Sequence, residues 1–122
     1  MILLIDDDQD IRETLTETLL LEGYEVTAAS DGQEALNFMN NGLRPSLILL
    51  DLMMPRMNGW KFLEVVKDEP EYAAIPVVVS TAMTRQSDSV RSAAAFIKKP
   101  LDLDSLLSFV KQYCGLPTKK SA

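Results

Sequence analysis

Four stretches of the chain place chemically active side chains directly after, or at the end of, short apolar runs. In chain order, these side chains are Asp6 with Asp7, Asp51, Ser80 with Thr81, and Lys98 with Lys99. Short, continuously apolar runs rich in branched residues are typical of parallel strands that are buried on both faces. Ligands of such a sheet bind in the crevice beyond the carboxyl ends of its strands. The sequence therefore predicts one site that combines carboxylates, a hydroxyl and an ammonium group.

The three carboxylates of this set are compatible with two kinds of chemistry. Asp6, Asp7 and Asp51 at one rim would repel one another unless a cation lay between them. Oxygen ligands with open positions suit Mg²⁺, which keeps water and can accept a phosphate oxygen. One of these aspartates could instead attack phosphorus and form an aspartyl phosphate. In that case Lys99 would supply a positive contact and Thr81 a hydroxyl donor for the phosphoryl oxygens.

Each of these residues also has a simpler interpretation when it is taken alone. An acid at the end of a strand is most often a solvated turn residue or a helix cap, and we interpret Asp8 and Asp10 in that way. A lone Lys-Pro sequence is usually a loop, and Phe96 would by default belong to the core. Independent accidents would rarely place all four sets at strand ends, so their joint occurrence favours a functional site.

Between the apolar runs, the spacing of apolar residues becomes helical. Ile11, Leu15 and Leu19 stand four apart within Asp10–Glu22, which predicts a helix that ends at Gly23. The other predicted elements are an edge strand at Tyr24–Ala28 and helices from a capping box at Ser30 and Gln33 to Gly42, over Trp60–Lys67, and over Asp102–Cys114. Strand and helix alternate five times, which predicts a doubly wound parallel sheet with right-handed crossovers.

Length and composition limit the possible classes of protein. The 122 residues leave room for one domain with a core of ordinary size. A net charge of −6 without a basic patch argues against binding to nucleic acid or to an anionic membrane, and no apolar run is long enough to span a membrane. The absence of histidine excludes any role as the histidine donor of a phosphorelay. A single cysteine, Cys114, fits the reducing cytoplasm, which is the location we predict.

At the residues of the predicted site, the chain resembles the receiver domain of two-component response regulators, over residues 1–115. The matching features are an acidic pair, a phosphoacceptor motif with its following loop, a fourth-strand hydroxyl and a fifth-strand Lys-Pro. In this chain they read Ile5-Asp6-Asp7, Leu49-Leu50-Asp51-Leu52-Met53-Met54-Pro55 with Met57-Asn58-Gly59, Pro76 before Ser80-Thr81-Ala82, and Lys98-Lys99-Pro100. Each motif is weak alone, but together and in this order they are highly specific.

The resemblance implies a metal-binding role for four residues. Asp51 would accept a phosphoryl group and would also bind Mg²⁺ directly, together with Asp7. Asp6 would bind the metal through water, and Met53 would bind it through its backbone carbonyl.

The resemblance further implies how the phosphoryl group is held and what it does. Thr81 and Lys99 would contact its oxygens, and Phe96 falls where the family keeps an aromatic switch residue. The phosphoryl donor would be a histidine kinase or a histidine phosphotransfer protein, and phosphorylation would switch a surface recognised by a protein target. The domain would catalyse only its own phosphotransfer and slow autodephosphorylation, so we do not expect an enzyme acting on other substrates.

The family's fold is the flavodoxin-like α/β fold, with a five-stranded parallel sheet in the order 2-1-3-4-5. We expect the receiver domain at residues 1–116 and a short tail at residues 117–122. Because the chain stops soon after the last predicted helix, we expect a stand-alone receiver without an output domain.

The main departure from the family is the segment between Thr81 and Lys99. These residues are 18 positions apart, which is shorter than the family leads us to expect by about one helical turn. We therefore predict a shortened fourth helix. Residues 85–92 offer almost no apolar face, so we predict that residues 83–95 are the least protected part of the unphosphorylated domain and become ordered on phosphorylation. A protein target would then suit the ordered form better than a second receiver would.

Three alternatives carry less weight. A Mg²⁺-dependent phosphatase with an aspartate nucleophile normally needs a second Asp two residues further on, and that position is Met53. Asp6, Asp8, Asp10 and Glu17 have the spacing of a calcium-binding loop, but its sixth position must be Gly and is Ile11 here. A receiver-like binding module that is no longer switched is disfavoured only by the complete set of site residues.

Overall fold

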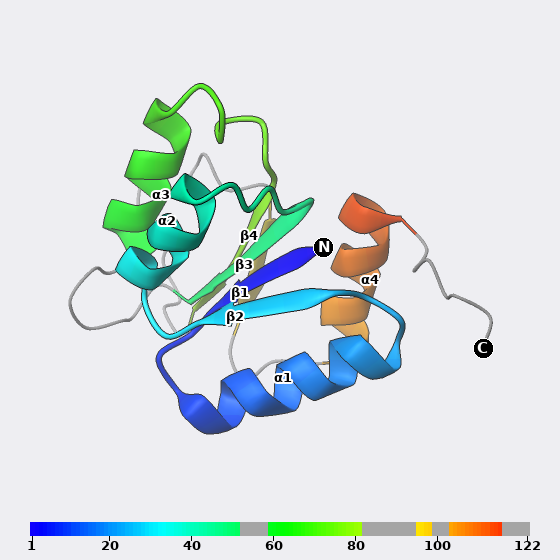
Figure 1. Cartoon of the computed structure of the whole chain (residues 1–122). Helices are drawn as coiled ribbons and strands as arrows, with labels where there is room; N and C mark the ends of the chain where they lie inside the picture. Colours follow the sequence, from blue (N-terminus) through cyan, green and yellow to red (C-terminus); the bar gives the residue numbers. More distant parts are fainter. Residues whose placement is uncertain (52–58, 82–94, 99–102, 116–122) are drawn as a thin grey trace.

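The computed structural model describes residues 1–51, 59–81, 95–98 and 103–115 (Figure 1). In chain order, its elements are β1 (Ile2–Ile5), α1 (Gln9–Leu21), β2 (Val26–Ala29), α2 (Gly32–Asn40), β3 (Leu47–Asp51), α3 (Gly59–Asp68), β4 (Val77–Thr81), β5 (Ala95–Lys98) and α4 (Leu103–Cys114). The predicted shortened helix between β4 and β5 falls on residues 82–94, outside the described residues, and so does the predicted tail.

The strands form one parallel sheet in the order β2-β1-β3-β4-β5, as the sequence predicts. Ile5 at the end of β1 is paired with Ala29 of β2 on one side and with Leu50 of β3 on the other. At the other edge, the backbone of Thr81 in β4 is paired with Lys98 of β5. In Figure 1, α2 and α3 lie on one side of the sheet, and α1 and α4 lie on the other. The predicted doubly wound α/β architecture is therefore confirmed.

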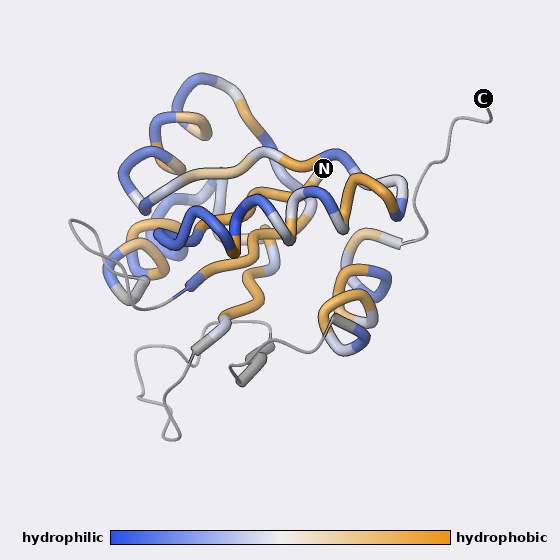
Figure 2. The backbone as a smooth tube through the Cα atoms, turned by 90° about the horizontal axis from the view of Figure 1, so that it is seen from below, coloured by the Kyte–Doolittle hydropathy of each residue, from blue (hydrophilic) through white to orange (hydrophobic). Residues whose placement is uncertain are grey.

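Burial on both faces explains why β1, and β3 as far as Leu50, are continuously apolar. Every residue of these two strands is buried. Successive side chains point to opposite faces, so Ile5 and Leu50 pack in one core cluster with Phe62 of α3, whereas Leu4 packs in a second cluster with Leu15 of α1. Figure 2 shows hydrophobic colours along the strands and mixed colours along the helices, as amphipathic helices require. None of the helices in the described ranges is long and apolar enough to cross a membrane.

Helix α1 begins and ends where its local sequence requires. Asp8 is the N-cap: its carboxylate accepts hydrogen bonds from the backbone N–H groups of Asp10 and of the next residue, at 2.9 and 3.2 Å. Gly23 follows the helix with a φ of 95°, a conformation that favours glycine. Leu15 and Leu19 face the core and are buried. The predicted helix and the capping role of Asp8 are confirmed, and the helix lies one residue earlier than predicted.

The start of α2 differs from the prediction by one residue. The spacing predicts a capping box at Ser30 and Gln33, but the N-cap is Asp31, whose carboxylate accepts from the Glu34 N–H at 2.8 Å. Glu34 in turn accepts from the Ser30 N–H at 2.7 Å, while Gln33 donates to the Asn37 side chain at 3.2 Å. The physical reason is that a carboxylate accepts a stronger, charge-assisted hydrogen bond than a hydroxyl does.

The remaining elements are present with small shifts at their ends. The predicted edge strand Tyr24–Ala28 is β2, and it starts later because the Tyr24 N–H donates to the Leu19 carbonyl at 3.0 Å and so closes helix α1. The buried Tyr24 hydroxyl donates to the Gly115 carbonyl at 2.9 Å, which joins the entrance of β2 to the end of α4. Helix α3 extends one residue further at each end than predicted, and α4 begins one residue later.

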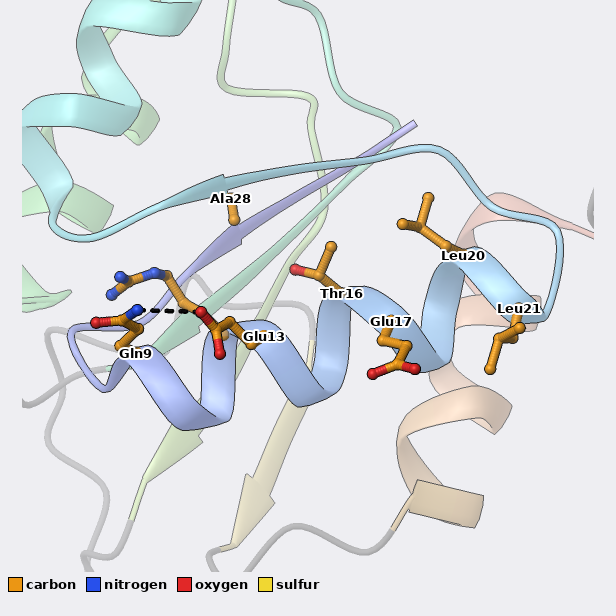
Figure 3. A pocket seen from close by; sticks show the side chains of 8 residues that line it. Gln9, Glu13, Thr16, Glu17, Leu20, Leu21 and Ala28 are labelled. Carbon is orange, nitrogen blue, oxygen red and sulfur yellow. Dashed lines mark hydrogen bonds between the residues drawn. The ribbon is translucent and has the colours of Figure 1, made fainter.

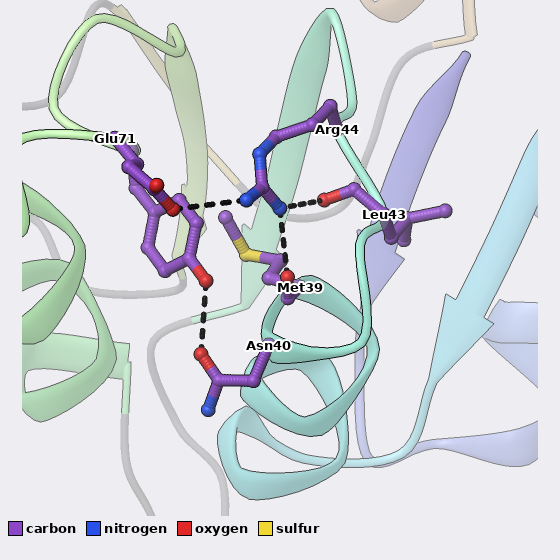
Figure 4. A network of polar contacts seen from close by, with 6 residues as sticks. Met39, Asn40, Leu43, Arg44 and Glu71 are labelled. Atoms are coloured by element: carbon purple, nitrogen blue, oxygen red, sulfur yellow. Dashed lines mark hydrogen bonds and ion pairs between the residues drawn. The ribbon is translucent and has the colours of Figure 1, made fainter.

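Arg44, between α2 and β3, ties together segments near the edge where the strands begin (Figure 4). Its Nη1 donates to the Met39 carbonyl at 2.7 Å, and its Nη2 forms an ion pair with Glu71 at 2.9 Å. The guanidinium also lies 5.1 Å from the centre of the Tyr72 ring, whose hydroxyl donates to Asn40 at 2.9 Å. An exposed ion pair contributes little to stability, so this network chiefly fixes the end of α2 against the connection between α3 and β4.

Candidate functional site

The carboxyl ends of β1 and β3 bring three aspartates together. β1 ends at Ile5, directly before Asp6 and Asp7, and β3 ends at Asp51. Because Ile5 is paired with Leu50 in the neighbouring parallel strand, the residues that follow these two lie at the same rim. One carboxylate oxygen from each of Asp6, Asp7 and Asp51 lies within 4.8 Å of the others. The sequence predicted this convergence of carboxylates from strand ends alone.

The three aspartates differ in their exposure to solvent. Asp6 and Asp51 are only 2% and 4% exposed, whereas Asp7 is exposed. Negative charges at this separation repel one another, and burial strengthens the repulsion because water no longer screens it. A cation beside the three groups would remove the repulsion, and the exposed Asp7 leaves the rim open to water and to a further ligand. A donor set of oxygen atoms with an open side fits Mg²⁺.

The turn that carries Asp6 is fixed by hydrogen bonds to three parts of the chain. The Asp6 N–H donates to the Ala29 carbonyl of β2 at 3.2 Å. Its Oδ1 accepts from the Asp8 N–H at 2.9 Å, and its carbonyl accepts from Nη1 of Arg12 at 2.8 Å. Sequence reasoning missed Arg12; its position one turn after the N-cap Asp8 is the signal that could have found it, because helical side chains point back toward the N-terminus.

The calcium-loop alternative is contradicted by the structure. It requires Asp6, Asp8, Asp10 and Glu17 to surround one ion within a loop. Instead, the chain is helical from Gln9 onward, and the Asp8 carboxylate caps that helix. Asp10 and Glu17 therefore lie on a helix, where they cannot complete a calcium loop with Asp6.

The hydroxyl predicted for the site comes from the end of β4. Ser80 and Thr81 are the last two residues of that strand, and Ser80 is paired with Asp51 of β3. Ser80, Asp6 and Asp51 are among the residues that line a small cavity of about 10 Å³. Ser80 is thus the hydroxyl residue that the described structure places on the same cavity as two of the carboxylates. The side chain of Thr81 lies outside what the structure describes, so its predicted phosphate contact stays a prediction.

Three other predicted site features also fall outside the described residues. Lys99 and Met53 lie in ranges that the structure does not describe, and so does the side chain of Phe96. Their predicted contacts with phosphate, with Mg²⁺ and with the switch stay predictions.

A larger groove, of about 660 Å³, lies between α1 and β2 and includes none of the three aspartates. Figure 3 shows Thr16 and Leu20 on α1 and Ala28 on β2 along this groove. Leu20 and Leu21 at the end of α1 are 53% and 76% exposed. Within the described part of the chain, Thr16 Oγ1 is a buried oxygen without a hydrogen-bond partner.

Three titratable groups with a clearly altered pKa lie toward the edge where the strands begin. Burial lowers the pKa of Lys67, whose ammonium group donates to the Ala73 carbonyl at 3.2 Å. Burial, followed by the nearby Cys114 and Glu22, raises the pKa of Tyr24. Burial also raises the pKa of the Cys114 thiol, so this cysteine is not activated as a nucleophile.

Comparison with known proteins covers nearly the whole chain, including most of the residues that the structure does not describe. A family model described as the response regulator receiver domain matches residues 2–111. An uncharacterized 14.6 kDa protein of Leptolyngbya boryana is 36% identical over 119 residues, covering 93% of this chain and 88% of that protein. The response regulator MprA of Mycobacterium sp. (strain KMS) is 36% identical over 111 residues, covering 88% of this chain and 47% of its own length. The chain thus spans about half the length of that regulator.

Solved structures agree in fold. The response regulator TrrA of Thermotoga maritima, in complex with Mg²⁺–BeF, superposes with a TM-score of 0.82 at 32% identity, covering 92% of this chain and 96% of that chain. Similarity of this extent in sequence and in structure covers nearly the whole folded region, and the chain belongs to the family of response regulator receiver domains.

Proposed function

We propose that this receiver domain accepts a phosphoryl group on Asp51, with Mg²⁺ held beside it, and thereby switches a surface that a protein target recognises. The observation that carries the proposal is the convergence of three carboxylates at the ends of two adjacent strands. We assign Asp51 as the acceptor because it lies within the central strand β3 and ends it, whereas Asp6 and Asp7 follow the end of β1.

The metal site would use the same carboxylates. Asp7 and Asp51 would bind Mg²⁺ directly, Asp6 through water, and Met53 through its backbone carbonyl. When bound, Mg²⁺ would offset the negative charge of the phosphoryl oxygens next to Asp51. The solved complex of TrrA with Mg²⁺–BeF supports the same class of ligand for this chain.

The transfer step would use Asp51 as the nucleophile. One carboxylate oxygen attacks the phosphorus atom, and the P–N bond of the donor's phosphohistidine breaks. The electron pair of that bond stays on the imidazole nitrogen, which takes up a proton from water. Thr81 and Lys99 would hold the phosphoryl oxygens. The domain would then lose the group slowly by hydrolysis, and it would act on no other substrate.

Membership of the family implies a histidine kinase partner within a two-component system. We propose that a histidine kinase or a histidine phosphotransfer protein donates the group, and that the downstream target is a protein. A net charge of −6 makes nucleic acid an unsuitable direct partner. The single cysteine of the sequence supports a cytoplasmic location.

Intact mass spectrometry after incubation with acetyl phosphate and Mg²⁺ tests the proposal. The wild type should gain the mass of one phosphoryl group, and Asp51→Asn should gain none. Asp8→Asn is the matched control, because Asp8 caps α1 and Asn is an equally good N-cap. Equal labelling of the wild type and Asp51→Asn would show that the acceptor is a different residue.

A further inference from the structure

The side chain of Arg12, in the body of α1, is hydrogen bonded to the acidic turn. Its Nη1 donates to the backbone carbonyl of Asp6 at 2.8 Å, and this contact is partly buried. Arg12 can reach this carbonyl because side chains on a helix point toward its N-terminus. Asp6 lies six residues earlier in the chain, just before the turn that opens α1.

The carbonyl that Arg12 holds belongs to the peptide unit that joins Asp6 to Asp7. A peptide unit is planar, so a bond to its oxygen also restricts the position of the Asp7 Cα atom. The other end of Asp6 is already held, since its N–H donates to Ala29 at 3.2 Å and its carboxylate accepts from Asp8 at 2.9 Å. Arg12 therefore completes a set of bonds that restrains the backbone from which the Asp6 and Asp7 carboxylates project.

Mg²⁺ makes this restriction functionally important. It demands near-ideal octahedral geometry, whereas the larger Ca²⁺ accepts variable geometry and coordination number. A guanidinium is also always charged, and its hydrogen bond to a carbonyl is charge-assisted and therefore strong.

We propose that Arg12 is a positioning residue for the Mg²⁺ site, which fixes the peptide plane between Asp6 and Asp7 and so favours Mg²⁺ over Ca²⁺. This inference rests on the proposed function of the acidic cluster. Arg12 acts through the backbone and is not itself a ligand of the metal or of the phosphoryl group.

Titration calorimetry with Mg²⁺ and, separately, with Ca²⁺ tests this role. Arg12→Ala should weaken Mg²⁺ binding by about 10-fold, the effect typical of removing a group that orients a ligand, and should weaken Ca²⁺ binding much less. Arg12→Lys keeps the charge but loses the planar guanidinium group. Its Mg²⁺ affinity should therefore lie between those of the wild type and Arg12→Ala. Arg44→Ala is the matched control: it removes the same charge and a similar bond to a backbone carbonyl, at the edge where the strands begin, and should bind both ions like the wild type.

The outcomes separate the possible explanations. An Arg12→Ala protein that binds Mg²⁺ as tightly as the wild type overturns the inference and leaves the proposed function intact. Equal losses for Mg²⁺ and Ca²⁺ in Arg12→Ala also overturn it, because the loss would then not depend on the coordination geometry that distinguishes the two ions. A wild type that binds no Mg²⁺ overturns both the inference and the metal site of the proposed function. If circular dichroism shows that Arg12→Ala is unfolded, the ratio of Mg²⁺ to Ca²⁺ affinity in Arg12→Lys decides: a lowered ratio supports the inference, and an unchanged ratio overturns it.

Discussion

Replacing Asp51 with asparagine should make the Mg²⁺-free protein more stable, although it removes the residue proposed to be phosphorylated. One carboxylate oxygen from each of Asp51, Asp6 and Asp7 lies within 4.8 Å of the others. At that separation, two full negative charges repel by about 3.5 kcal/mol at an effective dielectric constant of about 20, and by about 0.9 kcal/mol in bulk water. The repulsion by the buried Asp6 lies nearer the first value, and the repulsion by the exposed Asp7 lies nearer the second.

We expect the net gain to be smaller than the sum of the two repulsions, because asparagine would also change the other interactions of the Asp51 side chain. We expect a net stabilisation of about 2 kcal/mol, which corresponds to about 8 °C in the midpoint of thermal unfolding for a domain of this length. Thermal unfolding followed by circular dichroism, in EDTA and in excess Mg²⁺, measures the stability of each protein without and with the metal. In EDTA the variant should unfold at the higher temperature, whereas added Mg²⁺ should stabilise the wild type more than the variant.

Glu64→Gln provides the control for the change in net charge. Glu64 is an exposed residue on α3, and an exposed substitution of this kind should change stability by less than about 0.5 kcal/mol. If Asp51→Asn unfolds in EDTA at or below the temperature of the wild type, repulsion among the three carboxylates does not dominate this rim, and the electrostatic argument for a cation fails with it.

Three further predictions concern single side chains. Thr16→Val should stabilise the fold by about 1 kcal/mol in urea denaturation, because it replaces a buried hydroxyl that has no hydrogen-bond partner in the described part of the chain. Thr18→Val is its control and should not stabilise, because that hydroxyl donates to a backbone carbonyl at 2.8 Å. Tyr24→Phe should cost about 1 kcal/mol at neutral pH, because it removes a hydrogen bond to the end of α4. Because the folded-state pKa of Tyr24 is raised above its ordinary value of 10.0, the wild type should lose stability as the pH rises past that value, since the unfolded chain releases the proton first. The stability difference between wild type and Tyr24→Phe should then shrink, and a difference that does not depend on pH would contradict this assignment. Thr81→Ala should allow phosphorylation but uncouple it from the conformational change measured by hydrogen exchange, whereas Ser80→Ala should be mild; the reverse pattern would place the functional hydroxyl at Ser80.

Apolar periodicity was sufficient to predict the alternating strands and helices, because in this chain it follows directly from burial, whereas the strand order followed from the family resemblance. β3 is buried along its whole length and reads as a continuous apolar run, whereas α1 buries one face and reads as Leu15 and Leu19 four apart. The exact ends of the helices and strands were harder to predict, since each end depends on which of two competing hydrogen bonds forms. Asp31 rather than Ser30 caps α2 for this reason, and the sequence pattern alone could not rank the two acceptors.

The candidate site could be predicted only as far as it follows from strand ends. Asp6 and Asp51 lie together because adjacent parallel strands end at one rim. Arg12 could not be placed in the same way, and the strand end alone did not decide between Ser80 and Thr81. The contact of Arg12 depends on how α1 leaves the turn, and the pairing of Ser80 with Asp51 depends on the register between β3 and β4.

The three consecutive aspartates show how position alone can give one residue type three different environments. Asp6 is buried and hydrogen bonded within its turn, Asp7 is exposed at the rim, and Asp8 caps α1. These environments are mechanically connected, because the Asp8 N–H donates to the Asp6 carboxylate while the Asp8 carboxylate fixes the first turn of the helix that carries Arg12. The start of α1 therefore sets the geometry of the acidic cluster through two contacts. The Asp8 N–H donates to the Asp6 carboxylate, and Arg12, one turn along the helix, donates to the Asp6 carbonyl. Asparagine at position 8 would preserve both connections, since it can cap the helix and keeps the backbone N–H, whereas a residue without a capping side chain would keep the N–H but loosen the first turn of the helix that carries Arg12.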